Sequence, residues 1–282
     1  MSAPRGDLTV TALYTSGVWW WAGFSGAELL ISREARSVFR VTNAALALVG
    51  CLRADRRSLR RGLADRHALI DGLAGDCGAS VFVELAAGLS RRGLAFSADP
   101  SVRYVEVDLP AVIRHKETLL QRSEAGRRIL ARSNLQRVGA DVASVALPSL
   151  VPTTDKASES PQRICVIAEG LMMYLDADQQ RGLWCRIAAW LRDHPDSLFL
   201  FDLVPMSEQP APGLLGRGLG ALMGLFTGGR GFVVDPRDRH DIRRELLSCG
   251  FGSVELHEPD SDEGAAVPML VFACRGWRSS TP

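Results

Sequence analysis

Two short apolar stretches that contain acidic residues have the composition of buried strands. In the first stretch, Val81–Gly88, an apolar run that contains Glu84 ends in the small-residue turn Ala86-Ala87-Gly88. Such a turn lets the backbone approach a ligand closely, and the helix that follows presents free N–H groups toward it. Asp108 ends the second stretch, where its carboxylate can accept hydrogen bonds from both hydroxyls of an adenosine ribose. The pattern predicts a nucleoside-binding site at one edge of a sheet.

Two further acidic residues belong to the same predicted strands. Glu84 lies within the first strand and Glu106 within the second, and both are candidate cofactor-binding residues. Glu106 ranks below Asp108, because we expect its side chain to point to the opposite face of the sheet. The turn lacks the GxGxxG pattern that binds a pyrophosphate, which favours an adenosyl cofactor without phosphates.

Three later sites extend the predicted site. Asp141 and Val142 follow the third predicted strand, where the carboxylate can accept from an adenine amino group while the backbone of Val142 contacts the ring. Glu169 and Gly170 follow the fourth strand, at the switch point where open α/β sheets bind ligands. Upstream, Arg66 can pair with a carboxylate in a bidentate manner. Taken singly, each of these residues is also explained as a cap or a surface charge.

From residue 76 onward, short apolar runs alternate with helical stretches, which is typical of a mostly parallel sheet covered by helices. We therefore expect an α/β fold with a seven-stranded sheet. The expected strands are Val81–Leu85, Arg103–Val107, Gln136–Ala140, Ile164–Ala168, Leu198–Leu203, Ser253–His257 and Met269–Ala273. The expected helices between them are Ala111–Glu124, Ala177–Leu191 and Arg237–Ser248, the last ended by Gly250.

Two other parts complete the expected organisation. Residues 1–75 form an N-terminal helical cap, since apolar residues recur at helical spacing in Ala27–Phe39, Thr42–Leu52 and Asp65–Leu73. Residues 205–235 are an insertion after the fifth strand, which either covers the core as a helix or forms a lid over the substrate. We expect the cap and the α/β domain of residues 76–282 to form one structural unit.

An unusual run of aromatic residues lies near the start of the N-terminal cap. The consecutive Trp19, Trp20 and Trp21 cannot all face one side of a helix. Tyr14, Trp19 and Trp20, together with Phe226 of the insertion, could therefore line an apolar slot for an aromatic acceptor. The alternative is that they pack the N-terminal helices onto the sheet.

Composition narrows the remaining classes of function. A net charge of +1 gives no electrostatic case for nucleic acid or an anionic membrane, and no apolar run reaches the ~18 residues of a membrane span. The six cysteines are scattered without metal-ligand spacing, so we expect buried thiols, no metal site and a cytoplasmic protein. The sequence leaves open whether the chain is a monomer or a homodimer.

Five stretches resemble the leucine carboxyl methyltransferase family, in particular its bacterial branch of polyketide O-methyltransferases. The resemblance extends through about residues 60–205, and the stretches that carry it are Arg66–Asp71, Val83–Arg92, Tyr104–Lys116, Gly139–Val142 and Val166–Leu175. The resemblance implies a class I methyltransferase (Rossmann-like) fold and S-adenosyl-L-methionine as the cofactor.

The resemblance also implies roles for individual residues. Arg66 would bind the cofactor carboxylate, Asp108 the ribose, Asp141 and Val142 the adenine, and Glu169 would lie near the methionyl amine. The chain departs from the family pattern at two positions. The usual Gly-Ala-Gly turn is Ala86-Ala87-Gly88 here, and Ser90 stands where an acidic residue is usual.

The expected reaction is O-methylation of a carboxyl or phenolic hydroxyl of a small hydrophobic, polyketide-like natural product. A carboxylate acceptor is ionised at neutral pH and needs no base, whereas a phenol does. Tyr174 could orient the acceptor oxygen, and the histidines that could act as a base are His67, His115 and His240, of which we select His115.

Other functions remain open at this stage. An enzyme of the same fold could bind S-adenosylmethionine and catalyse a cyclisation or a decarboxylation without methyl transfer. A nicotinamide-dependent oxidoreductase is disfavoured by the missing GxGxxG, and a non-catalytic binding protein is disfavoured by the intact Arg66, Asp108, Asp141 and Glu169.

Overall fold

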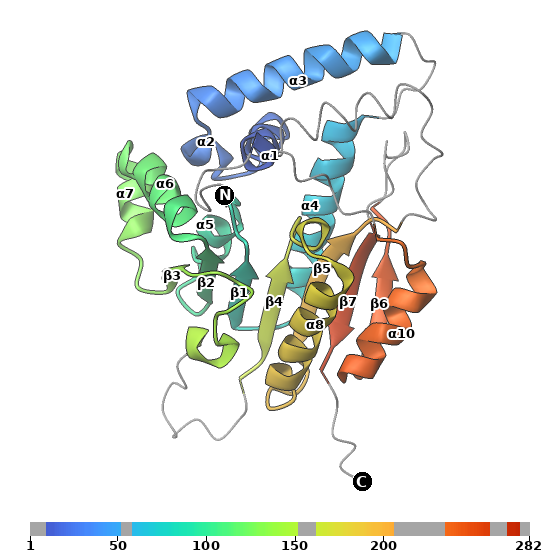
Figure 1. Cartoon of the computed structure of the whole chain (residues 1–282). Helices are drawn as coiled ribbons and strands as arrows, with labels where there is room; N and C mark the ends of the chain where they lie inside the picture. Colours follow the sequence, from blue (N-terminus) through green and yellow to red (C-terminus); the bar gives the residue numbers. More distant parts are fainter. Residues whose placement is uncertain (1–9, 52–57, 152–161, 206–234, 260–269, 277–282) are drawn as a thin grey trace, which may run out of the picture.

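The computed structural model describes residues 10–51, 58–151, 162–205, 235–259 and 270–276 (Figure 1). The expected Phe226 contact, and nearly all of the expected insertion at residues 205–235, lie outside the described residues. No helix within the described ranges is long and apolar enough to cross a membrane.

The sheet has the strand order β3-β2-β1-β4-β5-β7-β6. Neighbouring strands among β1–β5 pair in parallel, and β7 lies antiparallel to both β5 and β6. The bounds are β1 Val81–Leu85, β2 Arg103–Asp108, β3 Leu135–Gly139, β4 Ile164–Ala168, β5 Leu198–Leu203, β6 Ser253–His257 and β7 Leu270–Arg275. The sequence order reverses between β1 and β4, which makes their carboxyl ends the switch point. The predicted α/β fold is confirmed.

The strands are covered on both faces, as their nearly continuous apolar sequences require. On one face, α8 (Ala177–Leu191) and α10 (Arg239–Cys249) pack against alternate residues such as Val83, Val166 and Phe201. On the other face, α4 (Leu59–Asp76) and α6 (Pro110–Gln121) pack against Phe82, Tyr104 and Ile167. Figure 1 shows α8 and α10 in front of the sheet and α4 behind it.

The N-terminal residues form helices α1 (Val10–Trp21), α2 (Ala27–Leu30) and α3 (Arg33–Cys51) ahead of α4. In Figure 1 these three helices lie together beyond one end of the sheet. The prediction of one helix over Ala27–Phe39 was wrong. Ile31 is extended, and the Ser32 hydroxyl accepts a hydrogen bond from Ala35 N–H at 3.0 Å, which caps a new helix.

The predicted helix Ala111–Glu124 is also interrupted. Helix α6 ends at Gln121, and Ser123 caps α7 (Glu124–Leu130) by accepting a hydrogen bond from Gly126 N–H. The remaining short elements are α5 (Arg92–Phe96), η1 (Leu147–Leu150) and η2 (Met172–Tyr174). The predicted left-handed Gly250 after α10 is confirmed, with φ at +109°.

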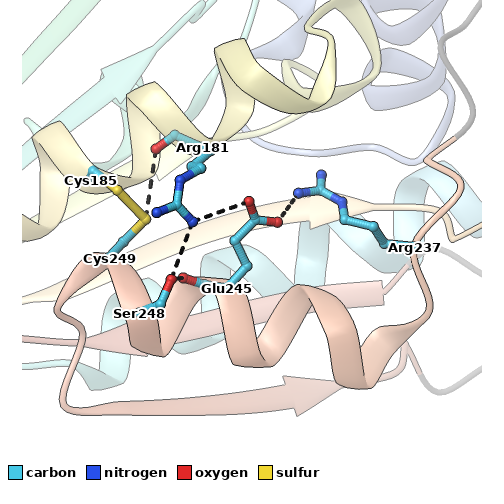
Figure 2. The surroundings of a disulfide bond; sticks show 6 residues. All are labelled: Arg181, Cys185, Arg237, Glu245, Ser248 and Cys249. Atoms are coloured by element: carbon cyan, nitrogen blue, oxygen red, sulfur yellow. Dashed lines mark hydrogen bonds and ion pairs between the residues drawn. A yellow bond between two sulfur atoms is a disulfide. The ribbon is translucent and has the colours of Figure 1, made fainter.

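A disulfide joins Cys185 of α8 to Cys249 of α10 (Figure 2). The expectation of buried thiols was therefore wrong for these two cysteines, which lie 64 residues apart on separate helices. Cys77, Cys165 and Cys274 are buried and free, as expected. The spacing of cysteines in the sequence does not predict this disulfide, because the two residues meet only through the packing of α8 against α10.

Candidate functional site

The turn after β1 has an unusual backbone. Ala86 and Gly88 both have positive φ values, +54° and +49°, a region that glycine adopts readily and alanine does not. Asp108, at the end of β2, fixes this turn, because one carboxylate oxygen accepts a hydrogen bond from Gly88 N–H at 2.6 Å. Its other oxygen accepts from Leu109 N–H at 2.7 Å. The structure thus brings the predicted turn and the predicted ribose ligand together.

A second turn follows β4. Asp202, near the end of the neighbouring β5, accepts a hydrogen bond from Gly170 N–H at 2.5 Å. Its other carboxylate oxygen accepts from Nη1 of Arg66 at 2.8 Å. Arg66 also donates from Nε and Nη2 to one oxygen of Glu169, at 3.1 and 2.9 Å. Arg66, Glu169 and Gly170 therefore meet as predicted, and Asp202 joins them.

Asp202 was not among the predicted site residues. The signal available in the sequence was a carboxylate within the otherwise apolar strand Leu198–Leu203. Burial raises its pKa, and the charge of Arg66 opposes that rise. A buried acid at a strand end needs such a partner, and its partner comes from α4, far away in the sequence.

Open space lies beside both turns. A Cβ atom built on Gly170, whose φ is +70°, would meet no heavy atom within 4 Å, and one built on Gly88 would meet only Ala86 O, at 4.0 Å. The turns thus leave room along the carboxyl ends of β1 and β4, where a ligand's methionyl and ribose groups could lie against backbone. The residues present fit an adenosyl cofactor.

Glu169 is the most heavily engaged carboxylate of the site. Its second oxygen lies 2.7 Å from Nδ1 of His67 and 2.7 Å from Nη2 of Arg92. Burial raises the pKa of Glu169, but its interaction with His67 and the charges of Arg66 and Arg92 outweigh the burial and hold the pKa well below its usual range. The sequence did not indicate the contribution of Arg92.

His67 connects this cluster to the N-terminal helices. Its ring packs against Trp19 and Phe24, with centroids 4.7 and 5.2 Å apart. Burial lowers its pKa to about 4, so the ring is neutral at physiological pH. We assign the proton to Nδ1, because this nitrogen lies 2.7 Å from the Glu169 carboxylate, closer than its 3.1 Å to Nη2 of Arg92, and because Nε of Arg91 can donate to Nε2 at 3.3 Å.

Glu84 and Glu106 lie beneath the turns rather than at the edge. The two residues are register partners in β1 and β2, and both are fully buried. Glu84 accepts from the Tyr104 hydroxyl at 2.9 Å and pairs with Arg92, while Glu106 pairs with Lys116 at 2.8 Å. These ion pairs tie β1 and β2 to Arg92 and Lys116 on the helices that follow them. The cofactor contacts predicted for the two glutamates stay predictions.

The predicted orientation of Glu106 was wrong. Residues two apart in a strand share a face, so Glu106 and Asp108 lie on the same side of the sheet. Lys116 also donates to Ser90 O at 2.6 Å and so ties the segment after the first turn to β2. This lysine ends one of the matching stretches, but the sequence pattern did not indicate its role.

Asp141 and Val142 follow β3 beside the ribose candidate. Ala140 N–H donates to Asp108 O at 2.8 Å, which places this loop next to the end of β2. Asp141 is exposed and accepts from Ala143 N–H at 2.9 Å, so it caps its own turn. Val142 is half-buried against the core. Their position fits the predicted adenine site, which stays a prediction.

The two predicted catalytic residues belong to different elements, Tyr174 to η2 and His115 to α6. Tyr174 is 37% exposed in η2, and Gln180 holds this turn by donating to Met172 O at 3.1 Å and Leu175 O at 3.2 Å. His115 lies on α6, where its buried Nε2 has no hydrogen-bond partner among the described residues. The structure places Tyr174 near the switch point and does not bring His115 to Glu169.

The aromatic residues of the cap pack within it. Tyr14 is buried against Phe39, with ring centroids 5.9 Å apart, and burial raises its pKa to about 12. Trp19 is buried against His67, and Trp20 lies under the guanidinium of Arg36 at 5.1 Å. These contacts fit the alternative interpretation, helix packing, and the acceptor slot stays a prediction.

Within the described ranges, His, Cys, Asp and Glu do not gather in a group that could hold a metal ion.

Comparisons with known proteins agree with this geometry. The family model described as leucine carboxyl methyltransferase matches residues 25–188. A proposed S-adenosyl-L-methionine-dependent methyltransferase of Frankia alni is 35% identical over 105 residues, which is 37% of this chain and only 35% of that protein's length.

Two solved structures share the fold. A proposed methyltransferase from Thermobifida fusca superimposes with a TM-score of 0.51 at 19% identity, covering 94% of each chain. An O-methyltransferase family protein from Burkholderia thailandensis superimposes with a TM-score of 0.52 at 13% identity. The match covers 96% of this chain and 73% of the Burkholderia chain. At these identities the likeness shows the fold alone.

The strand order and these solved structures show the class I methyltransferase (Rossmann-like) fold. Within that class, the chain belongs to the leucine carboxyl methyltransferase family. The Frankia relative is described as dependent on S-adenosyl-L-methionine, the cofactor that the sequence predicted for this chain.

Proposed function

We propose that the protein methylates an oxygen, in a carboxyl or phenolic hydroxyl group, of a small hydrophobic acceptor of polyketide type. The observation that carries the proposal is the pair of turns at Gly88 and Gly170, with open space beside each and with Asp108 and Arg66 held next to them. The small acceptor is supported by the likeness of Val83–Arg92 and Val166–Leu175 to polyketide O-methyltransferases.

The chain's own residues bind and align the two substrates. S-adenosylmethionine supplies a methyl group on a positively charged sulfur, and transfer requires the acceptor oxygen in line with that bond. In this proposal, Asp108 accepts the ribose hydroxyls and Arg66 binds the methionyl carboxylate. Trp19 and Phe24 cover His67 and so exclude water from one side of the cluster.

The two kinds of acceptor place different demands on the site. A carboxylate needs only orientation, which Tyr174 can provide from its exposed position in η2. A phenol must also lose a proton, and His115 is the base that the sequence analysis selected. The Nε2 atom of His115 is buried, so it is poorly placed to take a proton from an acceptor, and this favours the carboxyl acceptor, which needs no base.

A methylation assay tests the proposal. The purified chain would be incubated with S-adenosylmethionine and a panel of aromatic acids, phenols and a peptide ending in leucine, and both S-adenosylhomocysteine and the product would be quantified. Alkaline hydrolysis separates the outcomes, because methyl esters release methanol and methyl ethers do not. Methylation of the peptide alone would contradict the small-molecule acceptor. A rearranged product without S-adenosylhomocysteine would contradict methyl transfer.

A further inference from the structure

The family resemblance places Glu169 beside the methionyl amine, yet both of its carboxylate oxygens are already engaged. One oxygen accepts two N–H groups of Arg66, and the other meets His67 and Arg92, each at 2.7 Å. These partners come from α4 and α5, and all three side chains are buried. An incoming ammonium group would have to displace one of these partners from a fully satisfied carboxylate, at a large cost in this buried setting.

The carboxylate of Asp202 has fewer hydrogen-bond and ion-pair partners than that of Glu169. One carboxylate oxygen accepts the backbone N–H of Gly170, and the other has a single ion pair, with Nη1 of Arg66 at 2.8 Å. Gly170 is also the glycine beside which a Cβ would meet nothing within 4 Å. The carboxylate of Asp202 is therefore bonded to the turn that faces open space.

We propose that Asp202 accepts the ammonium group of the cofactor's methionyl moiety by exchanging ion pairs with Arg66. The inference rests on the proposed function, because it assumes that Arg66 binds the methionyl carboxylate. In the exchange, the methionyl carboxylate takes the place of Asp202 on Nη1 of Arg66. The ammonium group then takes the place of Arg66 on Asp202.

The exchange keeps every buried charge paired. The ion pair of Asp202 with Arg66 is replaced by two ion pairs, one to each charged group of the ligand, while Arg66 keeps its pair with Glu169, and no covalent bond is made or broken. A ligand with only a carboxylate would separate Asp202 from Arg66 and leave its negative charge without a cation. The contributions of the ligand's two charged groups are therefore cooperative, and Asp202 is the residue through which the amine is recognised.

Three ligands separate recognition of the amine from a structural role. Calorimetric titrations would compare S-adenosylhomocysteine, its deaminated analogue with hydrogen in place of the amino group, and 5′-methylthioadenosine, which lacks the amino-acid portion. The proteins would be the wild type, Asp202→Asn, and Asp178→Asn as a control that removes the same charge from an exposed position on α8.

The wild type is expected to bind S-adenosylhomocysteine at least about tenfold more tightly than the deaminated analogue, the usual scale of a charged hydrogen bond. Asp202→Asn is expected to lose that discrimination, while its affinity for 5′-methylthioadenosine is unchanged. Asp178→Asn is expected to match the wild type with all three ligands. Equal weakening of S-adenosylhomocysteine and its deaminated analogue in Asp202→Asn would assign Asp202 a structural role and overturn the proposal.

Glu169→Gln decides between the two carboxylates, even if Asp202→Asn does not fold. Retained discrimination between S-adenosylhomocysteine and the deaminated analogue in Glu169→Gln supports Asp202. Lost discrimination assigns the amine to Glu169 and overturns the proposal. A folded wild type that binds none of the adenosyl ligands would instead contradict the proposed function.

Discussion

Ala86 shows what a single side chain does to the backbone of the cofactor-binding turn. Its φ of +54° is a left-handed conformation, in which the Cβ of an L-residue crowds the following carbonyl at a cost of roughly 1–2 kcal/mol. The family pattern has glycine at this position. The end of β2 holds the turn on this path, because Ala87 N–H donates to Val107 O at 3.1 Å and Gly88 N–H donates to Asp108 at 2.6 Å.

We expect Ala86→Gly to raise the free energy of unfolding by about 0.5–1 kcal/mol, since relief of strain exceeds the extra entropy of glycine in the unfolded chain. Ala87→Gly is the matched control, because Ala87 is not among the residues with positive φ. That control should lower stability by about 0.5–1 kcal/mol. Urea denaturation of the three proteins measures both effects, and equal destabilisation by the two variants would show that Ala86 carries no strain.

The buried His67 gives stability a pH dependence. Burial lowers its pKa to about 4, below the unfolded value of about 6.5, so the unfolded chain binds a proton more readily between these two pH values. The contribution of His67 to the free energy of unfolding is therefore complete above about pH 6.5 and lost as the pH falls toward 4. Denaturation curves across this range should show the loss. His67→Gln should flatten the profile within this range, and an unchanged profile in the variant would contradict the assignment.

At the residue scale, the sequence predicted the residues that the structure brings to the strand ends. Arg66 lies against Glu169 and Gly88 lies against Asp108, and the strands β4 and β1 that precede Glu169 and Gly88 are neighbours. A carboxylate in an apolar strand marked Asp202 as unusual, but its partner could not be predicted, because no local pattern encodes an ion pair with α4.

At the scale of elements, apolar periodicity predicted the strands better than the helix boundaries. Strands β1, β4, β5 and β6 have the expected bounds, since buried strands are short apolar runs with clear ends. The expected helix over Ala27–Phe39 divides at Ser32, whose hydroxyl caps α3. Apolar spacing continues across such a break, so a capping hydroxyl within it is easily overlooked.

The disulfide between α8 and α10 is expected to stabilise the second half of the sheet. The linked cysteines lie before and after β5 in the sequence. Near the disulfide, Glu245 of α10 forms ion pairs with Arg181 of α8 and with Arg237 (Figure 2). Cross-linking residues 64 apart restricts the unfolded chain, so reduction should lower the free energy of unfolding by about 2–4 kcal/mol.

Thermal denaturation with and without dithiothreitol measures this contribution. The double variant Cys185→Ser/Cys249→Ser should melt close to the reduced wild type and should not respond to the reductant. A wild type whose melting temperature is the same with and without dithiothreitol would show that the disulfide does not form in the isolated protein.

At the scale of the whole molecule, the site exists because the chain order places α4, β1, β2, β4 and β5 around one edge of the sheet. The strand pattern predicted that edge, and the likeness of a few short motifs predicted the cofactor. The acceptor side could not be predicted in the same way. The aromatic residues nominated for it in the cap prove to be packed against Phe39, His67 and Arg36.

The most direct test of the account is calorimetric titration of the purified chain with S-adenosylmethionine and S-adenosylhomocysteine, for the wild type, Asp108→Ala and the exposed control Asp178→Asn. We predict micromolar or tighter binding of both ligands by the wild type and the control, on the order of 8 kcal/mol. Asp108→Ala should bind at least about tenfold more weakly, because the ribose hydroxyls lose their charged acceptor. A folded wild type that binds neither ligand, or an Asp108→Ala variant that binds as tightly as the wild type, would contradict the central claim.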